Sequence, residues 1–128
     1  MKLLLDTHIF LWLNDDPTQL SLTVKELFSS GEHELYLSMA SPWEIQIKCQ
    51  LGKLSLAMPI EELVNKNRQE NNIQLFPIEL SHISYLEQLP THHKDPFDRI
   101  NIAQAIIEGM TIIVTIDHVF ADYAVQIA

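Results

Sequence analysis

The chain is poor in cysteine, in basic residues and in long apolar stretches. Its single cysteine, Cys49, excludes an internal disulfide and is typical of a protein from a reducing compartment. Only 8 lysines and arginines stand against 17 aspartates and glutamates, and the formal net charge of -9 argues against a protein that binds nucleic acid through a basic patch. No stretch approaches the roughly 20 apolar residues of a membrane span. We therefore expect a soluble, cytoplasmic protein with no membrane partner.

The sequence also lacks a convincing secretion signal and a domain boundary. The apolar segment 1–5 briefly resembles a signal peptide, but Asp6 and His8 interrupt it and no small-residue cleavage site follows. No linker, repeat or low-complexity segment divides the 128 residues, and the hydrophobic content of 47% suits a single core. We expect one domain over residues 1–128.

Glycine is scarce, and each of the 3 glycines follows a segment with a helical pattern. Gly31, Gly52 and Gly109 are therefore expected to end helices, since glycine readily adopts the left-handed conformation of a helix C-cap.

The sequence pattern predicts alternating strands and helices. Strands are expected at 2–5, 34–38, 73–78 and 111–116, with a further one in the tail at 123–128. Helices are expected at 9–13, 21–30, 41–51, from 59 onward, at 81–89 and at 96–108. This alternation predicts an α/β fold with a parallel sheet and helices on both faces. Pro77 marks the strand 73–78 as an edge strand, or marks its end.

What the chain does have is four short acidic motifs, each placed where a strand ends or a helix begins. They are LLDTH at 4–8, SPWE at 41–44, DPFDR at 95–99 and VTID at 114–117. In a parallel α/β sheet, such positions gather at the carboxyl edge of the strands, where ligands bind. Four carboxylates in one place cannot all stay ionised unless a cation joins them. An all-oxygen site of this kind favours Mg²⁺ or Mn²⁺ as the cofactor.

Each acid also has a purely local explanation. The segments SPWE and DPFD both run cap, proline, aromatic, acid, and an acid three residues after the cap can close a capping box. Asp6 can cap the helix that follows it, and Asp117 can cap a short turn at 118–123. Capping predicts no common location for the acids, whereas a two-metal nuclease site requires that they converge. The two roles are compatible, because a carboxylate in a first helical turn can cap and still bind a metal.

In this order, the motifs resemble those of the PIN-domain ribonucleases, and within them the VapC-type toxins of bacterial toxin–antitoxin pairs. The resemblance covers nearly the whole chain and is carried by LLLDTH, SMASPWEIQIKCQLGKL, HHKDPFDRINIAQA and IIVTID, of which the first and third are the most specific. It implies a three-layer α/β/α domain with a mainly parallel five-stranded sheet. It also implies an endoribonuclease that depends on Mg²⁺ or Mn²⁺. The family's catalytic, metal-binding acids correspond to Asp6, Glu44, Asp98 and Asp117.

The resemblance further implies partners. The substrate would be RNA, cleaved to a 3′-hydroxyl and a 5′-phosphate. A cognate antitoxin would lay a C-terminal segment with basic or aromatic side chains across the acidic cleft, which attracts a cationic peptide. A homodimer is implied as well. No acid of the family pattern is missing, so nothing in the pattern points to an inactive enzyme.

Five further residues lie within the motifs or shortly after one of them. The hydroxyls of Thr7 and Thr115 could bond a carboxylate or a metal-bound water, although threonine is also a common strand and cap residue. Lys48 is placed for an ion pair with Glu44 four residues earlier, or alternatively for a phosphate contact. Arg99 could orient Asp98 or meet RNA, or it could be an ordinary exposed arginine on a helix. Asp95, at the cap position, is expected to be structural or to contact a metal ligand rather than the metal.

Other polar and aromatic residues have less specific interpretations. Trp43 and Phe97 are expected to anchor their helix starts in the core. His92, His93 and Lys94 form a short basic loop without the cysteine or histidine partners of a structural zinc site. Two alternatives to a nuclease stay open: a Mg²⁺-binding phospho-acceptor domain of receiver type, and a non-catalytic binding module whose acids are only caps.

Overall fold

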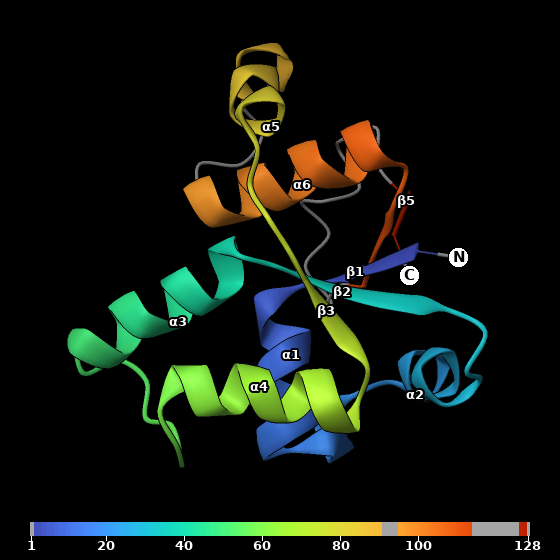
Figure 1. The fold of residues 1–128 in the computed structure, drawn as a ribbon, viewed down its shortest axis with the longest axis vertical. Helices are drawn as coiled ribbons and strands as arrows, with labels where there is room; N and C mark the ends of the chain where they lie inside the picture. Colours follow the sequence, from blue (N-terminus) through green and yellow to red (C-terminus); the bar gives the residue numbers. More distant parts are fainter. Residues whose placement is uncertain (1, 91–94, 114–125, 128) are drawn as a thin grey trace.

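The centre of the fold is a five-stranded sheet in the order β3-β2-β1-β4-β5, in which every neighbouring pair is parallel (Figure 1). The computed structural model describes residues 2–90, 95–113 and 126–127. The strands are β1 (Lys2–Leu5), β2 (Glu34–Ser38), β3 (Ile73–Phe76), β4 (Thr111–Ile113) and β5 (Gln126–Ile127). β1 lies in the middle, and β3 is an edge strand that ends just before Pro77, as the sequence predicts.

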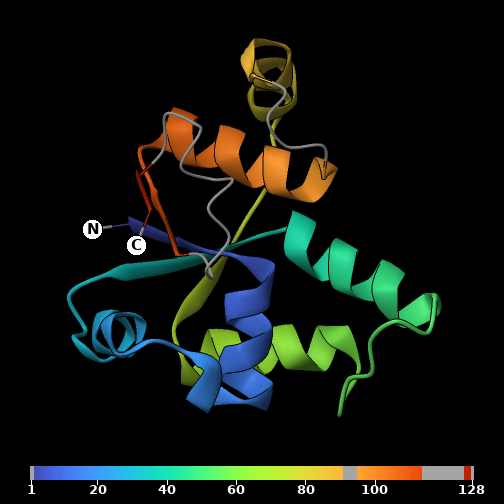
Figure 2. The ribbon, with the colours of Figure 1, turned by 180° about the vertical axis from the view of Figure 1, so that it is seen from behind.

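Six helices are described, together with two short 3₁₀ turns at Pro17–Gln19 and Leu86–Gln88, within the part of the chain that the structure describes. The helices are α1 (Thr7–Asp15), α2 (Leu22–Ser29), α3 (Ala40–Gln50), α4 (Ile60–Glu70), α5 (Leu80–Tyr85) and α6 (Pro96–Glu108). Figures 1 and 2 show α5 and α6 on one side of the sheet and α1, α2 and α4 on the other. The expected three-layer α/β/α fold is confirmed.

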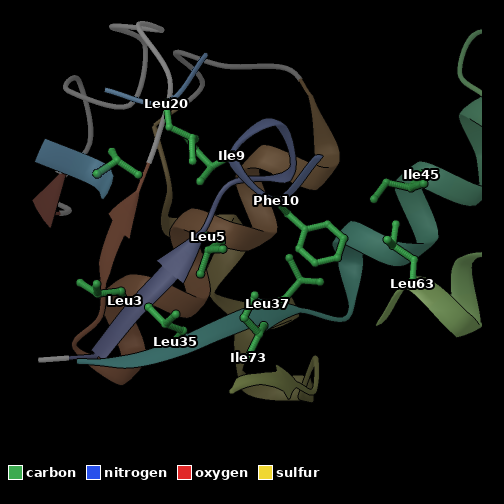
Figure 3. Close-up of a cluster of buried hydrophobic side chains, with 11 residues drawn as sticks. Leu3, Leu5, Ile9, Phe10, Leu20, Leu35, Leu37, Ile45, Leu63 and Ile73 are labelled. Atoms are coloured by element: carbon green, nitrogen blue, oxygen red, sulfur yellow. The ribbon is translucent and has the colours of Figure 1, made fainter. Parts of the chain in front are cut away.

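Two apolar cores lie on the two faces of the sheet because side chains alternate along a strand. Leu3 and Leu5 of β1 point into the core formed with α1 to α4, where Phe10 is fully buried (Figure 3). Leu4 points to the opposite face, into a second core formed with Ile102 and other residues of α6. The apolar run at the start of the chain is therefore a strand buried on both faces.

Several element boundaries differ from the sequence prediction. Helix α1 begins at Thr7 rather than residue 9, because Asp6 caps it. The expected helix 81–89 is divided between α5 and the 3₁₀ turn Leu86–Gln88. Helix α6 has the predicted bounds and ends at Gly109, whose φ of 67° is left-handed. Residues 91–94, 114–116, 123–125 and 128 of the expected loop and strands lie outside the described residues.

The strand order also bears on the receiver alternative. Receiver domains have the order 2-1-3-4-5, whereas this sheet has its first strand between the second and the fourth. The mid-chain strands β2 and β3 end in Ser38 and Phe76, not in an acceptor aspartate. The receiver interpretation is therefore wrong. Across the described ranges, no helix is long and apolar enough to cross a membrane.

Candidate active site

Three segments meet at the carboxyl edge of the sheet: the residues after β1, the start of α3 and the start of α6. Figures 1 and 2 both show the first turns of α3 and α6 near each other. The rings of Trp43 on α3 and Phe97 on α6 meet edge to face, with centroids 5.2 Å apart. Three of the four predicted acids, Asp6, Glu44 and Asp98, lie on these three segments.

Asp6 is buried and caps helix α1. Its Oδ2 accepts a hydrogen bond from the backbone N–H of His8 at 3.2 Å, and His8 Nδ1 lies 3.4 Å from the same oxygen. The hydrogen bond to Asp6 raises the pKa of His8 above its ordinary value, and burial opposes this effect. The cap interpretation of Asp6 is confirmed, and the side chain lies at the end of the central strand.

Glu44 is also buried, and both of its oxygens are engaged. Oε1 accepts a hydrogen bond from Thr7 Oγ1 at 2.8 Å, and Oε2 lies 2.8 Å from Lys48 Nζ. Thr7 Oγ1 is in turn 2.8 Å from Ser41 Oγ. Thr7 therefore bonds a carboxylate, the first of its two predicted roles, and it ties α3 to the end of β1.

The capping box predicted for SPWE is wrong. Ser38 Oγ accepts the hydrogen bond of the Ala40 backbone N–H at 3.1 Å, so the helix begins before Ser41. Ser41 is buried inside the first turn, and Glu44 points to Thr7 rather than back to a cap. Glu44 is thus a buried site residue and has no capping role.

Lys48 forms the predicted i,i+4 ion pair with Glu44. The hydrogen bond to Glu44 raises the pKa of Lys48, burial lowers it, and the charges of Glu44, Asp95 and Asp98 raise it further. The ammonium therefore lies within electrostatic reach of the acids at the start of α6. This observation links the third motif to the second.

Asp95 caps α6, as predicted. Its Oδ1 accepts hydrogen bonds from the backbone N–H groups of Phe97 and Asp98 at 2.9 and 3.2 Å. Asp98 lies in the first turn of the helix. Arg99 is partly buried and donates to the carbonyl oxygens of Pro90 and Leu86 at 3.0 and 3.1 Å, so it helps to fix the segment before α6. The expectation of an ordinary exposed arginine is wrong.

Trp43 is not a core residue, contrary to the prediction: its exposed fraction is 61%. It borders a pocket of about 220 Å³ whose walls include Ala40, Ile83, Leu86 and Phe97. The pocket is apolar and adjoins the helix starts that carry Glu44 and Asp98. SPWE and DPFD each carry an aromatic residue at the third position, and this shared position was the sequence signal for the contact between Trp43 and Phe97. We interpreted the two residues as separate core anchors.

Asn101 is a buried polar residue of α6 that follows the third acidic motif. It is 1% exposed, and neither Oδ1 nor Nδ2 has a hydrogen-bond partner among the described residues. It lies one helical turn after Asp98, on the same side of α6. No helical pattern singles it out in the sequence, because Asp98 and Gln104, one turn before and after it, are polar as well.

The profile of the PIN domain matches residues 3–126. The chain belongs to the PIN-domain family. The family is generally one of nucleases. The match spans all four acidic motifs. A search of curated proteins found no match.

Solved structures with the same fold cover almost the whole PIN domain. One is VapBC2 from Rickettsia felis, in a crystal structure with a DNA fragment from the VapBC2 promoter. It aligns with a TM-score of 0.73 and 15% identity over 100% of this chain and 98% of that chain. VapBC-1 from nontypeable Haemophilus influenzae aligns with a TM-score of 0.63 and 19% identity over 100% and 97%. FitAcB from Neisseria gonorrhoeae aligns with a TM-score of 0.63 and 16% identity over 98% and 95%. At these identities the likeness is one of fold.

Part of the predicted site of this PIN domain cannot be compared with the structure. Asp117 and Thr115, and the loop residues His92, His93 and Lys94, lie outside the described residues. Within residues 2–90, 95–113 and 126–127, no group of three or more His, Cys, Asp and Glu side chains could hold a metal ion. The metal-binding role of Asp6, Glu44, Asp98 and Asp117 stays a prediction.

Proposed function

We propose that this PIN domain is a metal-dependent endoribonuclease and the toxin of a type II toxin–antitoxin pair. Asp6, Glu44, Asp98 and Asp117 would hold Mg²⁺ or Mn²⁺. The observation that carries the proposal is the arrangement at the carboxyl edge of the sheet. Buried Glu44 is bonded to Thr7, which directly follows buried Asp6, and it pairs with Lys48, on which the charges of Asp95 and Asp98 also act. Membership of a family of nucleases supports the reaction class.

The chemistry of the donors fits a hard divalent ion. Asp6 and Glu44 offer carboxylate oxygens, the ligands that Mg²⁺ and Mn²⁺ prefer. Asn101 adds a buried amide with no partner among the described residues, and a buried polar group without a partner costs stability. When bound, a divalent ion supplies activation of water and neutralises charge on the phosphate.

The residues of the chain hold the acids in position for this reaction. Thr7 fixes one oxygen of Glu44, and the backbone of α1 fixes Asp6. Asp95 caps α6 and so sets the first turn that carries Asp98. The protein adds no covalent nucleophile, and water attacks the phosphodiester in line to leave a 3′-hydroxyl and a 5′-phosphate. An RNA substrate of this kind is consistent with a cytoplasmic protein.

The same surface suits an antitoxin segment with basic and aromatic side chains. A basic side chain would meet the acids, and an apolar one would enter the pocket beside exposed Trp43. The net charge of -9 favours a cationic partner. The similarity in fold to VapBC-1 and FitAcB supports a partner of this type. Homodimerisation stays a prediction from the family resemblance.

The test is cleavage of folded RNA by the purified protein with Mn²⁺, compared with EDTA and with Asp6→Asn. The matched control is Asp15→Asn, which neutralises an exposed acid at the other end of the same helix. We expect cleavage by the wild type and by Asp15→Asn, and a loss of at least 100-fold in EDTA and in Asp6→Asn, on the order of catalytic-group removals. Undiminished cleavage by Asp6→Asn would rule out the proposed mechanism.

A non-catalytic binding module is the second candidate. It is favoured by one observation: Asp6 and Asp95 both form helix caps. In that case RNA would not be cleaved by any variant with any metal, although the acidic surface would still bind its partner.

A further inference from the structure

Lys48 already places a positive charge among the acids that the proposed function assigns to a metal. Its Nζ lies 2.8 Å from Glu44 Oε2, and Thr7 occupies the other oxygen of Glu44 at 2.8 Å. The Glu44 side chain is only 5% exposed, so its charge has little contact with water. Among the residues that the structure describes, Lys48 supplies the ammonium that pairs with this buried carboxylate.

The influence of Lys48 extends beyond its own helix. The negative charges of Asp95 and Asp98 at the start of α6 act on its ammonium. On the other side, the charge of Lys48 acts on His8, which is bonded to Asp6 after β1. The ammonium therefore interacts with charged groups on all three segments that meet at the candidate site.

We propose that Lys48 is a resident counter-ion that occupies the carboxylate cluster when no metal is bound and competes with the divalent ion for Glu44. The proposal rests on the proposed function. A divalent ion held by Glu44 and the ammonium of Lys48 would repel each other, and both would be attracted to the Glu44 carboxylate. Lys48 would therefore have to give up its ion pair with Glu44 when the ion binds.

The side chain of Lys48 is suited to this exchange. It is 38% exposed, so its flexible four-carbon stem can carry the ammonium toward solvent once Glu44 is released. A lysine buried on all sides would instead stay in the cluster and exclude the ion. The consequence is a metal affinity that is lower than the carboxylates alone would give, together with a metal-free state in which Lys48 reduces their mutual repulsion.

The test measures the Mn²⁺ dissociation constant by calorimetry without RNA, for the wild type, Lys48→Met and Lys53→Met. Lys53 is an exposed lysine shortly after α3 and serves as the matched control. Lys48→Gln is a second neutral variant that keeps a polar end group beside Glu44, in case Lys48→Met does not fold without metal. We expect Mn²⁺ to bind roughly tenfold more tightly to both Lys48 variants, corresponding to about 1.4 kcal/mol, and unchanged in Lys53→Met.

The outcomes separate this proposal from the proposed function. Unchanged or weaker Mn²⁺ binding in the Lys48 variants, with binding by the wild type, would overturn the counter-ion role alone and leave Lys48 as an ordinary ion pair or a phosphate contact. If no variant binds Mn²⁺, both proposals fall. A Lys48→Arg variant keeps the charge and should retain the affinity of the wild type; a gain in affinity there would also contradict the proposal.

Discussion

Thr7 lies between two oxygens, Ser41 Oγ and Glu44 Oε1, each 2.8 Å from its hydroxyl. A hydroxyl group has a single hydrogen, so when Thr7 donates to Glu44 it accepts from Ser41. All three side chains are buried. The order of donation is therefore Ser41 to Thr7 to Glu44, and the position of the Glu44 carboxylate depends on a residue 37 positions away in the sequence.

Replacement of Thr7 by valine tests this arrangement. Valine has the same shape without the hydroxyl, and it leaves a buried oxygen of Glu44 without its donor. We expect the free energy of unfolding to fall by about 1–3 kcal/mol, measured by denaturant titration. Thr23→Val, at an exposed position on α2, is the matched control and should change it by less than about 0.5 kcal/mol. Equal effects of the two substitutions would show that Thr7 does not position Glu44.

At the scale of elements, the starts of α3 and α6 show how far sequence patterns reach. SPWE and DPFD have the same order of residue types, and both predict a cap followed by proline. Helix α6 follows the pattern, with Asp95 as its cap. Helix α3 does not: it begins at Ala40, its N-cap position is Met39 and no side chain caps it, while Ser38 Oγ accepts only from the Ala40 backbone N–H. A local pattern does not reveal that the helix starts directly after Met39 and therefore already includes Ser41.

The capping role of Asp95 can be separated from its charge. Asp95→Ala removes both, whereas Asp95→Asn keeps an oxygen that can accept from the N–H groups of Phe97 and Asp98. We expect Asp95→Ala to lower the free energy of unfolding by about 1 kcal/mol. Asp95→Asn should change the free energy of unfolding by no more than roughly 0.3 kcal/mol, because asparagine caps helices about as well as aspartate. Thermal or denaturant unfolding provides the measurement. A loss in Asp95→Asn as large as in Asp95→Ala would mean that the charge, and not the cap, stabilises the helix start.

At the scale of the whole molecule, the sequence predicted the layers better than the site. Short apolar runs and helical periodicity are local properties, and they were sufficient for the strands β1 and β2 and for α6. The contacts that build the site are not local. Glu44 accepts a hydrogen bond from Thr7, 37 positions earlier in the sequence. The charges of the acids at the start of α6, about fifty residues after Lys48, raise the pKa of its ammonium. Such contacts depend on the strand order, which periodicity alone does not give. The exposure of Trp43 was missed for the same reason.

A gathering of the four carboxylates would also affect the stability of the whole molecule, because a ligand that binds only the native state stabilises it. If Asp6, Glu44, Asp98 and Asp117 converge, the metal-free protein carries their mutual repulsion, reduced by Lys48. Asp6→Asn would relieve part of this repulsion while its amide oxygen still caps α1, since asparagine and aspartate cap helices about equally well.

The most direct test of the central claim is the melting temperature of the wild type and of Asp6→Asn during a titration with Mn²⁺, with Asp15→Asn as the control. We expect the wild type to gain about 2.7 kcal/mol of stability at a free Mn²⁺ concentration of 100 times Kd, and the Asp15→Asn variant to follow it. The Asp6→Asn variant should melt higher without metal and respond less to Mn²⁺. A wild type that does not respond to Mn²⁺, together with an Asp6→Asn variant that melts lower, would contradict the proposed metal site.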